Sequence, residues 1–199
     1  MLSHVMSPTF DQVEEPVEKS DGASRADNLS PDLSLRRAAL QSAYDDPAAH
    51  VYDVHQALLD VMFAKLESRP SMPWTREEHI CYDAFMLDVE AYNGGFAQWI
   101  HNHFSARMSM TRMALQCIGA GWAAELLDEF VRALPIRIRS VLAKNDIQKL
   151  NGYRLSHRRE RLLDAIDDRY FAENSVKGDD ASVAGLTLAY ARRHRVGLA

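Results

Sequence analysis

Cysteines, signal-like leader residues and long apolar runs are all scarce or missing in this chain of 199 residues. Its two cysteines, Cys81 and Cys117, fall in apolar helical patterns, which favours buried thiols of a reducing compartment over a disulfide framework. No apolar run approaches the roughly 20 residues that a membrane span needs. The N-terminus has no basic start followed by an apolar block. These absences predict a cytoplasmic protein without a membrane-spanning segment.

Basic side chains are scarce in the first two thirds of the chain. Residues 1–60 carry 11 acidic and 4 basic side chains, and residues 61–130 carry 9 and 5. Residues 131–199 reverse the balance with 8 acidic and 14 basic side chains, and the whole chain has a net charge of −5. The asymmetry indicates either two partner surfaces or two surfaces that complement each other within the fold.

Apolar residues recur at three- and four-residue steps over most of the chain, which predicts an all-α fold. A hydrophobic content of 47% suffices for one substantial core, so we expect a single bundle-like domain of about seven helices at residues 30–195. Residues 1–29 show no period and few apolar side chains, and we expect them to form a disordered acidic tail.

Turn and capping residues predict several helix boundaries. Thr75-Arg76-Glu77-Glu78 is a capping box that begins a helix, and that helix is apolar almost all round, which favours a central position. Asn93-Gly94-Gly95 can take positive φ and should end it in a sharp reversal. We expect separate helices at residues 96–104 and 109–118, a helix or irregular connection at residues 136–151, and a polar loop at residues 174–180.

Catalytic and metal-binding patterns are weak. His101 and His103 are two residues apart, so on a regular helix they point in directions about 200° apart and do not share one ion. Asp164, Asp167 and Asp168 could bind a cation or act as acid and base, but nearby arginines favour a solvated, salt-paired face. We therefore predict no metal, no cofactor and no catalytic residue.

A basic cluster lies in the last third, with Arg154, Arg158 and Arg161 as its candidate phosphate contacts. The alternative interpretation is a charged outer face or a cradle for the acidic tail. Because the whole chain is acidic and no helix-turn-helix pattern accompanies the cluster, direct nucleic-acid binding is disfavoured.

The residues after the glycine pair form the most specific motif of the chain, Asn93-Gly94-Gly95-Phe96-x-Gln98-Trp99-x-x-Asn102. Gln98 and Asn102 lie one turn apart on one face, where they either hold the turn or bind a ligand. The motif resembles the N-G-G-F-x-Q-aromatic-x-x-N pattern of the DNA mimic protein 19 family. Segments at residues 114–127 and 163–190 are similar to that family in the same order, so the resemblance covers roughly residues 50–195.

The resemblance implies an all-helical domain without known enzymatic activity. A described member of the family presents carboxylates spaced like duplex phosphates and occupies the DNA-binding surface of a helix-turn-helix regulator. Here such a surface would use the acidic tail or the carboxylates of the first half, of which Asp53 and Asp60 share a helix face. These candidate partner-binding residues are Asp45, Asp46, Asp53, Asp60, Glu77, Glu78, Asp83, Asp88 and Glu90. The last third of the chain has a net positive charge, whereas a DNA mimic presents a broadly negative surface.

The leading hypothesis is a non-enzymatic regulator or inhibitor of a basic protein partner, with DNA mimicry as its specific form. The alternatives are a nucleic-acid-binding domain that uses the basic residues 137–161, a small hydrolase around Gln98, His101 and Asn102, and an immunity-type protein. Homodimerisation stays open.

Overall fold

The computed structural model describes residues 31–68, 74–144 and 154–198. These residues form eight helices and no strand, which confirms the all-α prediction and exceeds the expected helix number by one. In chain order the helices are α1 (Pro31–Asp45), α2 (Val51–Ser68), α3 (Arg76–Ile118), α4 (Gly121–Ala133), α5 (Ile136–Ala143), α6 (His157–Val176), α7 (Gly178–Ala181) and α8 (Val183–His194). The tail predicted at residues 1–29 lies outside the described residues.

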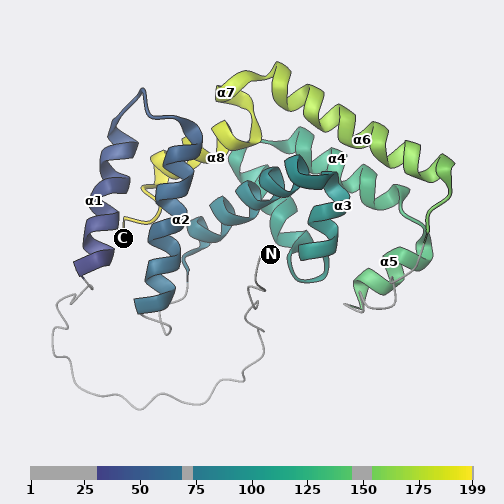
Figure 1. The fold of residues 1–199 in the computed structure, drawn as a ribbon, viewed down its shortest axis with the longest axis horizontal. Coiled ribbons are helices and arrows are strands. Elements are labelled where there is room, and N and C mark those ends of the chain that lie inside the picture. Colours follow the sequence, from purple (N-terminus) through teal and green to yellow (C-terminus); the bar gives the residue numbers. More distant parts are fainter. Residues whose placement is uncertain (1–30, 69–73, 145–153, 199) are drawn as a thin grey trace, which may run out of the picture.

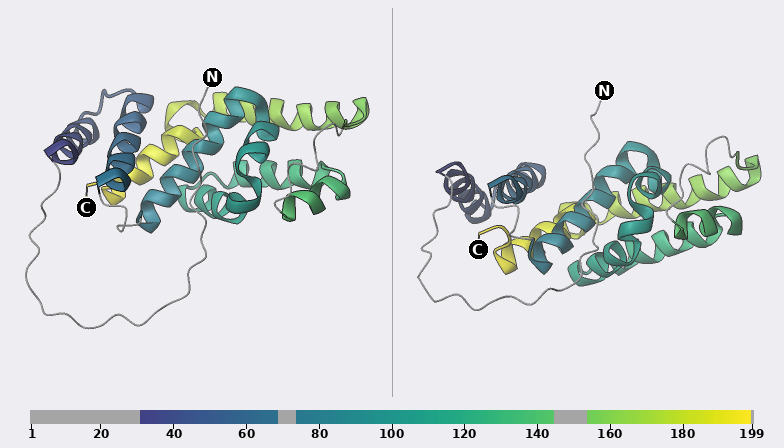
Figure 2. Two further views of the ribbon diagram at one scale, coloured as in Figure 1. Left: turned by 60° about the horizontal axis from the view of Figure 1, so that its bottom comes forward. Right: turned by 90° about the horizontal axis from the view of Figure 1, so that it is seen from below.

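The helices form an elongated body with two ends of different composition. The α1–α2 pair lies at one end, and α5 with the first turns of α6 lies at the other (Figures 1 and 2). Helices α3 and α8 pack against each other in the middle, and α4 packs along α6. The α1–α2 pair and the basic start of α6 are therefore far apart in space.

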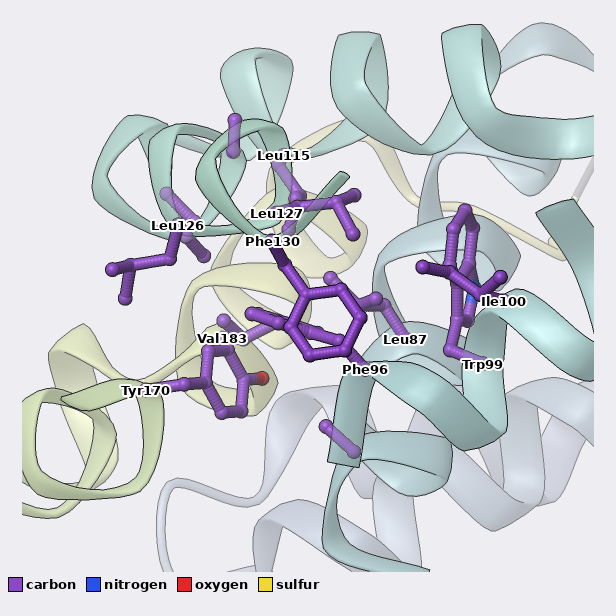
Figure 3. Close-up of a cluster of buried hydrophobic side chains, with 14 of the residues drawn as sticks. Leu87, Phe96, Trp99, Ile100, Leu115, Leu126, Leu127, Phe130, Tyr170 and Val183 are labelled. Atoms are coloured by element: carbon purple, nitrogen blue, oxygen red, sulfur yellow. The ribbon is translucent and has the colours of Figure 1, made fainter. Parts of the chain in front are cut away.

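Two hydrophobic clusters hold the body together. The larger one centres on Phe96, whose ring lies 5.6 Å from the ring of Phe130 and 5.0 Å from that of Tyr170 (Figure 3). Edge-on contacts of this kind are the favoured geometry for aromatic pairs. The smaller cluster joins α1 and α2 to α8, with Leu40 and Val54 fully buried. Burial of each such aliphatic side chain contributes about 2 kcal/mol.

Local signals place the main helix ends as expected. The Thr75 hydroxyl accepts a 3.1 Å hydrogen bond from the Glu78 amide, and the Glu78 carboxylate accepts one of 2.6 Å from the Thr75 amide, so the capping box is confirmed. Gly119 takes a left-handed conformation with φ of 89° and ends α3. An L-residue pays a steric cost there, whereas glycine does not.

Three sequence expectations are wrong or incomplete. Residues 96–118 form one continuous helix, because no glycine or proline interrupts the stretch between the two predicted helices. The predicted polar loop at residues 174–180 is helical except at Lys177, because α6 extends to Val176 and α7 begins at Gly178. Its Asn174 is buried and makes hydrogen bonds to other elements. Of the two cysteines, Cys81 is buried as expected, but Cys117 is exposed.

The connection at residues 136–151 begins as helix α5, and the part after residue 144 lies outside the described residues. Among the described helices, none is long and apolar enough to cross a membrane.

Candidate partner-binding surface

A kink in α3 positions the family motif. The backbone leaves the helical region at Gly94 (φ −177°, ψ 30°) and at Gly95 (φ 71°, ψ −177°), and helix resumes at Phe96. The positive φ of Gly95 lies in a region that is almost restricted to glycine. The predicted reversal is thus confirmed, and it turns Phe96 and Trp99 into the larger hydrophobic cluster, where both are buried (Figure 3).

Side chains from both sides stabilise this kink. The Phe96 amide donates a 2.9 Å hydrogen bond to the Asp167 carboxylate of α6, which thereby caps the second half of α3. After the kink, Asn102 donates a 2.9 Å hydrogen bond back to Glu90, which precedes it. Gln98 packs closely on Gly94, where an added Cβ would lie 3.0 Å from the Gln98 Cβ. Asn102 therefore has a structural contact at the kink, and Gln98 packs against the turn.

Asp167 belongs to this structure and not to a solvated face, so that interpretation is wrong for this residue. Burial raises the pKa of its carboxyl group from 3.8 to about 6, the Phe96 amide opposes the rise, and the charges of Asp164 and Asp168 add to it. Phe96 and Asp167 are 71 residues apart, so no local pattern indicates their contact.

Replacing Asp167 by asparagine should make stability less dependent on pH. The folded-state pKa of a raised carboxyl exceeds its unfolded-state value, so its stabilising contribution is complete at low pH and is lost as pH rises through about 6. Asparagine keeps an oxygen for the Phe96 amide but does not titrate. Urea unfolding at about pH 4 and about pH 7 should show that wild type loses stability relative to Asp167→Asn. An equal difference at both pH values would contradict this, and Asp180→Asn, an exposed carboxylate, is the control.

Three of the predicted surface carboxylates are buried, so their assignment to an accessible acidic surface is wrong. Glu78, Asp83 and Asp88 have 2%, 2% and 1% of their surfaces exposed. A buried carboxylate requires a partner to offset its desolvation. Each of these three carboxylates has such a partner on another segment of the chain.

The partners of these carboxylates connect distant parts of the chain. Glu78 accepts hydrogen bonds of 2.8 and 3.1 Å from the Lys65 ammonium of α2. Asp83 pairs with Arg107 across the α3 kink. Asp88 accepts hydrogen bonds from Tyr170 and Asn174 of α6. The Glu78 and Asp83 side chains therefore hold α3 in place within the fold.

The remaining predicted carboxylates stay accessible to different degrees. Asp45, Asp46 and Asp53 are exposed, whereas Asp60, Glu77 and Glu90 are half-buried. Asp45 is 3.2 Å from Arg195 of the C-terminal end, which partly neutralises it. Asp46 accepts a 2.8 Å hydrogen bond from the Ala48 amide and thus shapes the α1–α2 turn. Asp53 and Asp60 remain as the strongest candidates for partner contact.

The outward face of α2 carries four polar or acidic side chains and one phenylalanine at intervals of three and four residues. Asp53, Gln56, Asp60, Phe63 and Glu67 lie at least partly at the surface, while the other side of the helix packs on α1, α3 and α8. The three carboxylates are seven residues apart, a spacing of about 10.5 Å along the helix. Gln56 donates a 2.9 Å hydrogen bond to Asp60 and orients it. We call Asp53, Asp60 and Glu67 the α2 acidic row. Glu67 was not singled out from the sequence, although it repeats the same interval.

The candidate phosphate contacts of the last third lie at the other end of the molecule. Arg154, Arg158 and Arg161 are all exposed at the start of α6, beyond α4 and next to α5 (Figure 1). Their neighbour Arg159 is half-buried and donates to the Ala133 carbonyl of α4. The cluster is therefore accessible, and it leaves the α2 acidic row uncovered.

A polar cavity of about 220 Å³ opens where α2, α3, α6, α7 and α8 meet. Asp88 lies in its wall, with Oδ1 accepting hydrogen bonds from the Tyr170 hydroxyl (2.6 Å) and the Asn174 amide (3.0 Å). Burial raises the pKa of the Asp88 carboxyl group, and the two hydrogen bonds oppose the rise. Its second oxygen, Oδ2, is buried without a hydrogen-bond partner among the described residues.

Acidic and metal-ligating side chains do not gather into an ion site in the part of the chain that the structure describes. There, no group of three or more His, Cys, Asp or Glu side chains could hold a metal ion. The histidines of α3 have other neighbours, since His79 lies 5.5 Å from the ring of Trp74 and His103 lies 6.4 Å from that of Trp99.

Most of the described helices fall within a stretch that matches a known protein family. The family profile described as DMP19-like protein matches residues 72–194, a range that begins just before α3 and ends with α8. The matched range includes the kink motif and Asp167, and it leaves α1 and α2 outside. Neither a curated protein nor a solved structure matches the chain.

Proposed function

The chain belongs to the DMP19-like protein family, and we propose on this basis that it is a non-enzymatic regulator that binds and inhibits a basic DNA-binding protein. In this proposal the α2 acidic row occupies the surface with which the partner binds duplex phosphates. The family name is consistent with DNA mimicry. The partner class proposed is a helix-turn-helix regulator of a bacterial cell.

The single observation that supports this proposal is the accessible row of Asp53, Asp60 and Glu67, in which Asp53 and Glu67 are exposed and Asp60 is half-buried. The three carboxylates follow one another at intervals of about 10.5 Å along one helix face. They therefore offer a line of negative charges to the lysine and arginine side chains that otherwise contact phosphates. Such contacts compete directly with DNA because they use the same cations.

The distribution of charge supports the same surface. The exposed arginines at the start of α6 lie at the far end of the body, so they do not cancel the negative potential of α2 (Figure 1). Near α2, the half-buried Arg192 donates to the backbone carbonyl of Asp46 at 3.0 Å, and Arg195 pairs with Asp45. Neither contact involves the α2 acidic row.

Reversing the charges of the α2 acidic row should weaken partner binding. A basic protein retained by the chain from a bacterial lysate at low salt is identified and purified, and its affinity is then measured by titration. The triple variant Asp53→Lys, Asp60→Lys, Glu67→Lys should bind roughly 10- to 100-fold more weakly and lose most of the salt dependence.

A control with the same change in net charge separates this effect from general repulsion. Glu125, Glu160 and Asp164 are exposed and lie away from α2, so their replacement by lysine should change the affinity much less. Retention of no basic protein at low salt, or equal weakening by both triple variants, would contradict the proposal.

The accessible arginine cluster favours one second candidate, a nucleic-acid-binding surface. Titration with labelled duplex at about 50 mM salt tests it, because low salt favours phosphate contacts. Binding that disappears in Arg154→Glu, Arg158→Glu, Arg161→Glu would support this candidate. No binding at that salt concentration would remove it.

A further inference from the structure

We propose that the polar cavity beside Asp88 receives one cationic side chain, an arginine or a lysine, from the partner protein. The site anchors that side chain at the end of the α2 acidic row. This inference rests on the proposed function for the identity of the partner, whereas the chemistry of the cavity is independent of it.

The wall of the cavity offers an acceptor to which no described residue donates. Asp88 Oδ2 is buried without a hydrogen-bond partner among the described residues, while Oδ1 is held by Tyr170 and Asn174. These two contacts fix the orientation of the carboxylate. Among the described residues that line the cavity, Asp88 alone carries a charge. After a small movement of the side chains that cover Oδ2, a donor that enters the cavity would meet an oriented carboxylate oxygen, and no described lining residue supplies a competing cation.

The opening of the cavity adds aromatic surface. The Tyr52 and Tyr92 side chains line it and remain 46% and 52% exposed. Tyr92 is held in place by Phe171, whose ring lies 5.3 Å away, and by the Asn174 amide, which donates to its hydroxyl at 3.2 Å. Cations bind favourably over the faces of tyrosine rings, and charge-assisted hydrogen bonds to carboxylates are strong. A carboxylate at the base with tyrosines at the entrance suits a guanidinium or ammonium group.

The volume of the cavity and its position beside α2 indicate that its occupant is a side chain of another protein. A volume of about 220 Å³ is below the roughly 300 Å³ at which pockets for drug-sized ligands begin. Tyr52 lines the cavity, and the next residue along α2 is Asp53, the first member of the α2 acidic row. A partner whose basic side chains follow this row could thus place one more in the cavity.

Asparagine at position 88 is the most conservative test of the site. It keeps the oxygen that accepts from Tyr170 and Asn174, but it replaces the unused oxygen by a donor. Ser175→Trp is the second variant, because Ser175 is exposed and lines the cavity without contacting Asp88 in any described hydrogen bond. It should block the entrance and leave the carboxylate intact. Thermal unfolding of both variants verifies that they are folded.

The first experiment uses the full-length ¹⁵N-labelled protein and the probe N-acetyl-arginine amide. Saturable shifts of the backbone amides of Tyr92, Gly178 and Ser182 are expected, together with at least a tenfold loss of affinity in Asp88→Asn and in Ser175→Trp. N-acetyl-glutamine amide, which is neutral, should cause none of these shifts. The absence of saturable shifts in wild type, or an unchanged affinity in both variants, would overturn the proposal.

The second experiment measures the affinity of the purified partner for Asp88→Asn, which should fall at least tenfold. If the probe binds but the partner's affinity is unchanged, the anchoring role is overturned, and the cavity is a site for a free guanidinium or ammonium compound. If the probe fails to bind while charge reversal on α2 still releases the partner, the result supports the proposed function and rejects the cavity site. If the probe binds and no basic partner exists, the proposed function fails, and the anchoring role fails with it.

Discussion

Replacing Lys65 by methionine should lower the free energy of unfolding by about 3–5 kcal/mol, because the change leaves the Glu78 carboxylate buried without its cation. Lys65 and Glu78 are each only 2% exposed, and the ammonium lies 2.8 and 3.1 Å from the two carboxylate oxygens. The stability of a domain is usually only about 5–15 kcal/mol. The single substitution should therefore remove a large fraction of it.

The double variant Lys65→Met, Glu78→Met distinguishes an unpaired charge from lost packing. Replacement of a whole buried ion pair by apolar side chains is often neutral or stabilising. Here it also removes the carboxylate half of the Thr75 capping box, a loss of about 1 kcal/mol. Urea unfolding should thus show the double variant to be clearly more stable than the single one, with exposed Lys144→Met close to wild type. A double variant that is as unstable as the single one would contradict this account of the pair.

Replacing Gly95 by alanine should destabilise the protein by about 3–4 kcal/mol through two effects at the α3 kink. The backbone at φ 71° and ψ −177° is strained for any residue with a Cβ atom. That atom would also lie 2.8 Å from Cγ of Asp167 and displace the carboxylate that caps Phe96.

Two further variants test this explanation of Gly95. Gly121→Ala places its Cβ in open space at the start of α4, so it should be neutral or stabilise by up to about 1 kcal/mol. Gly95→Ala combined with Asp167→Ala removes the overlap but not the backbone strain, so the double variant should remain destabilised. Urea unfolding of all three is the measurement. A Gly95→Ala protein within about 1 kcal/mol of wild type would contradict the assigned strain.

The sequence predicted those parts of the fold whose causes are local. A capping box needs only Thr75 and Glu78, which are three residues apart, and a reversal needs only the residues of the Asn93-Gly94-Gly95 turn. Both were identified correctly for this reason. The break expected between residues 104 and 109 was wrong because the stretch contains no residue that ends a helix.

The candidate surface was predicted only in part, because burial depends on distant contacts. Asp88 meets Tyr170 over 82 residues of sequence, and no local pattern reveals such a pair. One available signal was nevertheless missed. The first half of α3 is apolar almost all round, which indicates a central helix, and carboxylates on a central helix are buried with partners. Asp53 and Asp60, by contrast, lie on a helix with one polar face, and their seven-residue interval placed them on the same side of that helix.

Competition with duplex DNA tests the central claim of this account most directly. The purified basic partner is bound to a labelled duplex at low salt, and the chain is added in increasing amounts. Wild type should displace the duplex, whereas the variant with lysine at Asp53, Asp60 and Glu67 should require at least a tenfold higher concentration. Failure of wild type to displace the duplex, or equal displacement by the variant, would show that α2 does not act in place of DNA phosphates.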